Sequence, residues 1–250
     1  MKKKLFFVGL MLALSLGASA QDQEFSFGLR LGPNFNWIGS RAGAAENHGD
    51  KSGTDVGFDL GFVAEYYFTE NYALVTGVNV NFLRGQYDFA DKRVIGNDTI
   101  LGVVDRKFKT TVFEIPLMFK MVTPELGSIP LRLYAQLGGA FGVSPRVKVK
   151  DIFPLGGISE DQYRVAKGEY NPIHASLRAG IGANYEILET MKVFLGCYYS
   201  YDILNGISSG VQGITSNYRK YYQGDEAFGA RDVRLDIHQH RIGIELGILF

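Results

Sequence analysis

Large apolar residues occupy every second position in eight segments of this 250-residue chain. In the first segment, for example, Phe25, Phe27 and Leu29 alternate with Ser26 and Gly28. Because successive side chains of a strand point to opposite faces, this period predicts strands with one apolar face and one small or polar face. The segments span residues 25–37, 55–68, 72–82, 112–121, 131–143, 173–187, 192–202 and 241–250.

The length of the segments and of their connections indicates where such strands reside. A tilted strand crosses an outer membrane with about 9–11 residues, whereas strands of soluble sandwiches have about 5–6. Three connections are short, around residues 69–71, 122–129 and 188–191, and four are long and polar, around 38–54, 91–107, 146–171 and 205–234. Outer-membrane barrels alternate short periplasmic turns with long extracellular loops in this way.

We therefore predict an all-β fold, an eight-stranded antiparallel up-and-down transmembrane β-barrel with both termini in the periplasm. A ten-stranded barrel is the structural alternative, if the third or fourth long loop contains another membrane-crossing hairpin.

The first twenty residues read as a cleaved signal peptide. Three lysines precede an apolar stretch over residues 5–16, and Ala18-Ser19-Ala20 is the small-residue pattern of a cleavage site. The stretch is shorter than the ~20 residues of a transmembrane helix. The predicted organisation is a signal peptide over residues 1–20 and an outer-membrane β-barrel domain over residues 21–250.

Charge and cysteine content exclude several classes of protein. Lys plus Arg and Asp plus Glu both number 26, and loss of the three signal-peptide lysines leaves 23 against 26, a net charge of −3. A nucleic-acid binder normally has a basic surplus, so we expect no nucleic-acid partner. The single cysteine, Cys197, excludes a disulfide framework, and on the lipid face it is expected to act as a small apolar residue.

Charged residues on the small and polar faces predict a filled lumen. An eight-stranded barrel is only wide enough for its own side chains, and buried charges persist when they are paired. Six cations and five anions share the inward parity, which predicts a structural polar network of Arg30, Asp59, Glu65, Glu114, Lys120, Arg132, Arg178, Glu186, Lys192, Arg241 and Glu245.

Bulky outward residues near the strand ends predict two aromatic girdles at the membrane interfaces. The predicted periplasmic girdle contains Tyr66, Phe68, Tyr72, Tyr185 and Phe250. The predicted extracellular girdle contains Trp37, Phe82, Phe141, Tyr199 and Tyr201.

The segment Glu-Ile-Pro-Leu-Met-Phe-Lys at residues 114–120, the glycine-rich alternating strands and the terminal Phe250 resemble the PorT-like outer-membrane β-barrel family of Gram-negative bacteria. The resemblance covers nearly all of the mature chain. It implies an integral outer-membrane protein of the cell envelope with a cleaved signal, and assembly by the barrel-assembly machinery through the C-terminal strand. The name-giving member is associated with a protein-secretion and gliding apparatus. The resemblance implies no catalytic or ligand residues.

Histidines are the residues with the greatest potential for chemistry. His238 and His240 share the outward parity and follow Asp236, an arrangement that could bind a metal or assist a serine nucleophile. No nucleophile motif such as G-x-S-x-G is placed against this pair, and two histidines without a third ligand make a weak site, so we expect interfacial residues near lipid phosphates. His174 is expected to be a hydrogen-bonded lumen residue. The sequence thus predicts no catalytic, cofactor or metal site, and no enzyme.

Two segments are predicted to lie above the membrane-spanning part of the barrel. Gly-Asn-Asp at residues 96–98 separates two β-rich runs and is typical of a hairpin turn, which would create a protruding ribbon; a surface loop is the alternative. Arg106, Lys107 and Lys109 predict a solvated outer rim that contacts lipopolysaccharide phosphates.

The function predicted is that of a structural or interaction barrel with a plugged lumen. Its long loops would serve adhesion, partner docking or support of a secretion apparatus, and its expected partners are outer-membrane lipid, lipopolysaccharide and an envelope protein. A narrow, porin-like small-solute channel is the first alternative, and a surface lipid-modifying enzyme at His238 and His240 is the second.

Overall fold

A computed structural model describes residues 25–40, 53–95, 98–152, 163–166, 170–188, 190–204, 206 and 237–250. These residues form the strands β1 (Phe25–Ser40), β2 (Asp55–Thr69), β3 (Tyr72–Ile95), β4 (Asp98–Val122), β5 (Leu131–Val143), β6 (Val147–Ile152), β7 (Arg164–Val165), β8 (Ile173–Leu188), β9 (Met191–Asp202) and β10 (Ile237–Leu249). Within this described part, no helix is long and apolar enough to cross a membrane.

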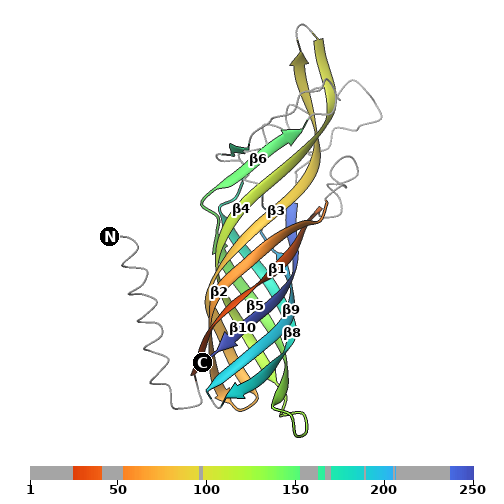
Figure 1. The fold of residues 1–250 in the computed structure, drawn as a ribbon. Coiled ribbons are helices and arrows are strands. Elements are labelled where there is room, and N and C mark those ends of the chain that lie inside the picture. Colours follow the sequence, from red (N-terminus) through yellow and green to blue (C-terminus); the bar gives the residue numbers. More distant parts are fainter. Residues whose placement is uncertain are drawn as a thin grey trace, which may run out of the picture.

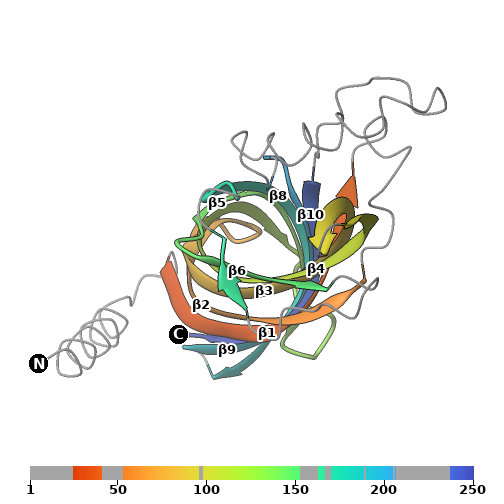
Figure 2. The same cartoon turned by 90° about the horizontal axis from the view of Figure 1, so that it is seen from above.

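Eight of the ten strands close into a ring. The hydrogen-bonded order β3-β2-β1-β10-β9-β8-β5-β4 is completed by pairing of β3 with β4, and each of these pairings is antiparallel. Figure 2 shows the ring from above. β1 and β10, the first and last strands of the wall, are neighbours, with Trp37 opposite His240. The predicted eight-stranded antiparallel barrel is confirmed.

The β3–β4 hairpin continues far beyond the rest of the wall (Figure 1). The two strands remain paired from Tyr72 opposite Met121 to Ile95 opposite Asp98. Only residues 96 and 97 connect them, so the predicted hairpin is confirmed and the alternative of a surface loop over residues 91–107 is wrong. A two-residue connection is the commonest hairpin geometry.

β6 extends the wall on the other edge of β4. β5 pairs with β4 as far as Val143 opposite Phe113, and β6 resumes at Val147 opposite Thr110. β6 is therefore a continuation of β5 after residues 144–146, above the ring, and not a ninth strand of the wall. The predicted fourth loop falls mainly on residues outside the described ones, and the predicted signal peptide over residues 1–20 lies wholly outside them.

The outer wall is apolar and the inner wall is polar. Leu137 and Ile181 on the outside are each 62% exposed, whereas Arg178 inside is 1% exposed. A soluble monomer rarely presents contiguous apolar patches above a few hundred Å², and here the apolar residues encircle the barrel. The alternating sequence pattern thus places its apolar face outward, toward lipid.

Candidate functional site: the lumen and its mouth

The end of the lumen with the short turns is sealed by an apolar cluster and an ion pair. Val75, Met118, Phe194 and Leu249 belong to the cluster. Lys120 from β4 lies 2.6 Å from Glu65 of β2, and both side chains are at least 96% buried. The Lys120 ammonium also lies 4.3 Å from the centroid of the Tyr134 ring. Full burial of a lysine is tolerated because the carboxylate and the aromatic face replace its water.

Two further layers of charge follow along the barrel axis. In the middle layer, Arg30 donates to Glu245 at 2.9 Å, and Glu245 also accepts from Tyr134 and Gln136. In the upper layer, Glu114 accepts from Arg178 at 2.8 Å and from Arg241 at 2.7 Å. Each carboxylate thus has several buried donors, the condition under which buried charge is stable.

The structure places the predicted network in two environments. Eight of the eleven residues are buried in the lumen: Arg30, Asp59, Glu65, Glu114, Lys120, Arg178, Arg241 and Glu245. The other three lie at the end with the short turns. Glu186 and Lys192 form a partly exposed pair at 3.1 Å, and Arg132 donates to the carbonyl oxygens of Thr123 and Glu70.

At several positions an aromatic ring fills the lumen where the facing wall carries glycine. A Cβ added to Gly182 would lie 2.4 Å from the Tyr134 ring, and one added to Gly243 would lie 2.3 Å from the Tyr198 ring. The Tyr198 hydroxyl in turn donates to Asp59. Glycine is required at these inward positions because a bulky ring occupies the space of its side chain.

The predicted girdle residues lie on the outer wall. Near the end with the short turns, Phe68 and Tyr72 stack with centroids 6.3 Å apart. Near the other end, Trp37 stacks on His240 at 5.4 Å. Exposed fractions of the remaining rings range from 38% to 72% for Tyr66, Phe82, Phe141, Tyr185, Tyr199 and Phe250, and Tyr201 is partly buried against His238 and His240.

The histidines of β10 differ from one another. His240 faces outward and lies 2.7 Å from the Tyr199 hydroxyl. His238 is only 4% exposed, and its Nδ1 donates to the carbonyl oxygen of Asp202 at 2.8 Å. The expectation that His238 is an interfacial residue beside lipid phosphates is therefore wrong, since the side chain is enclosed. Asp236 lies outside the described residues.

The predicted cationic rim of Arg106, Lys107 and Lys109 differs from the expectation at one residue. Lys107 and Lys109 lie on β4 opposite β6, but Arg106 is 5% exposed and forms two hydrogen bonds with Asp151 of β6, one of them 2.7 Å long. Arg106 is therefore a buried ion-pair partner that ties β6 to β4, and the prediction of a solvated side chain is wrong for it.

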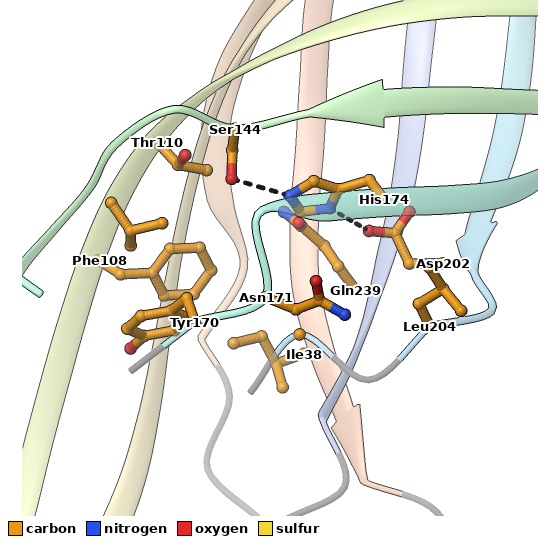
Figure 3. Close-up of a pocket in the computed structure, with 12 residues that line it drawn as sticks. Ile38, Phe108, Thr110, Ser144, Tyr170, Asn171, His174, Asp202, Leu204 and Gln239 are labelled. Atoms are coloured by element: carbon orange, nitrogen blue, oxygen red, sulfur yellow. Dashed lines mark hydrogen bonds and ion pairs between the residues drawn. The ribbon is translucent and has the colours of Figure 1, made fainter. Parts of the chain in front are cut away.

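A pocket opens at the mouth of the lumen, at the end opposite the short turns and beyond the Glu114 layer. Figure 3 shows residues that line it. It contains about 470 Å³ of empty space, part of it open to solvent. Ile38, Phe108, Val147, Tyr170 and Leu204 supply apolar walls, and Thr110, Ser144, Asn171, His174, Asp202 and Gln239 supply polar groups. The pocket thus combines an apolar lining with a few convergent polar side chains, which is typical of small-molecule sites.

Three of the polar groups form a connected chain. His174 Nε2 lies 3.0 Å from Ser144 Oγ, and His174 Nδ1 lies 3.3 Å from Asp202 Oδ2. A carboxylate only accepts hydrogen bonds, so Nδ1 carries the proton of a neutral ring, and Nε2 accepts from the Ser144 hydroxyl. His174 is a hydrogen-bonded lumen residue, as predicted.

Strand register explains this meeting of distant residues. Gly142 of β5 is opposite His174 of β8, and Ser176 is opposite Asp202 of β9. Ser144 and Asp202 are therefore diagonal neighbours of His174 on the inner face, within reach of one another's side chains. The inward parity of His174 and Asp202 is readable from the sequence, but their partnership with Ser144 requires the register.

Comparisons with known proteins agree with this architecture. Residues 19–224 match the family described as outer membrane protein beta-barrel domain. No curated protein matches the sequence.

Several solved structures of small outer-membrane proteins are similar. Neisserial surface protein A is 11% identical, with 88% of this chain and 95% of that chain covered and a TM-score of 0.40. Ail, the attachment invasion locus protein of Yersinia pestis, is 16% identical, with 91% and 100% covered and a TM-score of 0.35. OprG from Pseudomonas aeruginosa is 14% identical, with 91% and 96% covered and a TM-score of 0.40. The closed eight-stranded ring, its apolar outer wall and the match over most of its length show that the chain belongs to the outer membrane protein beta-barrel domain family.

Proposed function

We propose that this outer-membrane barrel is an interaction protein: its lumen is a solid structural core, and its extracellular β-ribbon docks another protein at the cell surface. Adhesion and support of a secretion apparatus are both uses of such docking, and the second agrees with the PorT-like resemblance of residues 114–120. We further propose that both chain termini face the periplasm, at the end of the barrel with the short turns.

The filled lumen supports a non-conducting barrel. Three layers of buried ion pairs, built around Glu65, Glu245 and Glu114, cross the interior at successive heights. Opening a path for solutes would separate at least one of these pairs in a poorly hydrated space, which costs several kcal/mol.

We expect purified barrel in planar bilayers to give no stable single-channel openings. Reconstitution into the same lipid must be verified by heat-modifiable gel mobility, in which unboiled protein runs as the compact form. Stable openings of uniform conductance would instead support the alternative of a small-solute channel.

The single observation that carries the docking proposal is the length of the β3–β4 ribbon. β4 extends for 15 residues, from Asp98 to Val112, beyond its last pair with β5, which is about 50 Å of strand. Beyond Phe82, β3 pairs with β4 on one edge and with no other described strand on the second edge. Such an edge is a template for an extended segment of another chain, bound through main-chain hydrogen bonds.

A photo-crosslinking residue at Ala90, on this β3 edge, is expected to capture one surface or envelope protein in intact cells. The matched control carries the same residue at Leu137, on the lipid-facing wall, and is expected not to capture that protein. Equal capture of the protein at both positions would contradict docking at the ribbon.

A shortened ribbon provides the second arm of this test. The pair Tyr87–Arg106 lies an even number of residues along the strands from the pair Ile95–Asp98. Hydrogen-bonded and non-hydrogen-bonded pairs alternate along an antiparallel ladder, so these two pairs are of the same kind. Residues 88–105 can therefore be replaced by Asn-Gly without a change of register. We expect this variant to keep its heat-modifiable mobility and to lose co-purification of the protein captured at Ala90.

A further inference from the structure

We propose that the pocket at the mouth of the barrel is a hydrolytic site for carboxylic esters with an apolar acyl group, with Ser144 as nucleophile, His174 as general base and Asp202 as the positioning residue. The proposal is independent of docking at the ribbon. It departs from the expectation of a non-enzymatic protein, which rested on the absence of a nucleophile motif near His238 and His240.

The three residues have the geometry that this chemistry needs. The distance of 3.0 Å from Ser144 Oγ to His174 Nε2 allows the imidazole to remove the hydroxyl proton as Oγ attacks. The contact of 3.3 Å from His174 Nδ1 to Asp202 fixes the tautomer and stabilises the imidazolium that forms. Because such a site is recognised by geometry and not by sequence order, the order Ser-His-Asp along this chain is no objection.

The backbone around the three residues is held in place. The amide of Ser144 donates to the carbonyl oxygen of Pro172 at 2.7 Å, which joins the end of β5 to the start of β8. The carbonyl oxygen of Asp202 accepts a hydrogen bond from His238 Nδ1. The following amide, that of Ile203, donates to the carbonyl oxygen of Ala175 at 2.7 Å. The site therefore rests on rigid strand ends, as a preorganised site requires.

Gln239 is the observation that points to a ligand. Its side-chain Nε2 is buried and has no hydrogen-bond partner among the described residues, and the residue lines the same pocket as Ser144. In Figure 3 the Gln239 side chain runs toward the Ser144–His174 hydrogen bond. An unpaired buried donor is unfavourable in the empty protein, and it becomes useful when a negatively charged oxygen forms beside it.

The reaction balances without an oxidant, metal or cofactor. Ser144 Oγ forms a bond to the ester carbonyl carbon while its proton passes to His174 Nε2, and the resulting oxyanion accepts from Gln239 Nε2. Collapse breaks the bond to the alkoxide, which takes the proton from Nε2 and leaves as the alcohol. Water then adds to the acyl-serine in the same way, which releases the carboxylic acid and restores Ser144.

The pocket wall identifies the substrate class. Ile38, Phe108 and Val147 line the pocket together with Tyr170 and Leu204, and no lysine or arginine is among the described residues that line it. An acyl chain fits such walls, whereas a phosphate or another anionic group would find no cation there. The apolar wall is formed by only these five described side chains, so we expect soluble short-chain esters to be preferred over lipids.

The test uses the folded full-length barrel with a fluorescent fluorophosphonate and with p-nitrophenyl butyrate. We expect covalent labelling on the peptide that contains Ser144, located by mass spectrometry, and hydrolysis of the butyrate ester. Ser144→Ala should abolish labelling, and His174→Gln should lower the hydrolysis rate at least about 100-fold. Fatty-acid release from phosphatidylcholine vesicles, measured in parallel, would identify a lipid as the source of the ester.

Ser176→Ala is the matched control. Ser176 is 4% exposed on the same inner face of β8, its Oγ has no hydrogen-bond partner in the part of the chain that the structure describes, and it does not line the pocket. Labelling and hydrolysis should equal those of the unaltered chain. Heat-modifiable mobility verifies that each variant is folded. The proposal is overturned if the folded unaltered chain is not labelled at Ser144, or if neither ester is hydrolysed faster by it than by Ser144→Ala.

Discussion

Replacing Glu114 by Gln is expected to lower the free energy of unfolding by about 3–5 kcal/mol, the usual cost of removing one partner from a buried charge pair. The Glu114 carboxylate is the direct acceptor for two guanidinium groups, those of Arg178 and Arg241, and all three side chains are at least 97% buried. The neutral amide leaves two cations in the lumen, with Asp59 at 3.9 Å from Arg241 as the nearest remaining carboxylate. Urea-induced unfolding in lipid vesicles, followed by gel mobility, measures the change.

Glu186→Gln is the matched control for this experiment. Glu186 pairs with Lys192 at 3.1 Å, but the two side chains are 26% and 23% exposed, so water replaces the lost interaction. The expected change is about 0–1 kcal/mol. The double variant Glu114→Gln/Arg178→Gln should be more stable than Glu114→Gln alone, because it removes one of the two uncompensated cations. Equal effects at Glu114 and Glu186 would contradict a dry, ion-paired lumen.

The wall of the barrel was predictable because it depends on local pattern. Alternation along residues 173–187, for instance, places Arg178 inside and Ile181 outside whatever the neighbouring strands are, since a strand has a period of two. The short turns and long connections then indicated eight strands, with ten as the alternative that the structure had to decide. For the segment that forms the β3–β4 ribbon, the sequence favoured a hairpin and a surface loop equally. The turn signal at residues 96–98 is compatible with either structure.

The contacts inside the barrel were not predictable to the same depth. Glu114 and Arg241 are 127 positions apart in sequence, and their meeting depends on the stagger of every strand between them. His238 shares the parity of His240 but is enclosed, since parity determines the face of a strand and not what covers it. Ser144 follows the last paired residue of β5, where alternation ends, so the mouth pocket was missed for the same reason.

Arginine in place of Ile181 is expected to cost about 2–4 kcal/mol of unfolding free energy in lipid vesicles, the penalty for a lipid-facing cation at the bilayer midplane. Ile181 lies on the outer wall of β8, 62% exposed, opposite Ala135 on one side and Cys197 on the other. These positions are midway between the two aromatic girdles. In a water-soluble protein the same substitution would be nearly neutral, because a side chain this exposed would already be hydrated.

Ile187→Arg tests whether that cost comes from depth in the membrane. Ile187 is on the same strand and the same face, 49% exposed, but it lies near the end of the barrel with the short turns, beside Tyr185 of the girdle. An arginine there reaches the interface, so the expected cost is about 0–1 kcal/mol. A similar loss at both positions would mean that the apolar wall is covered by protein, because burial against protein penalises a charge at either height. Only a bilayer makes the cost of the arginine depend on its distance from the midplane.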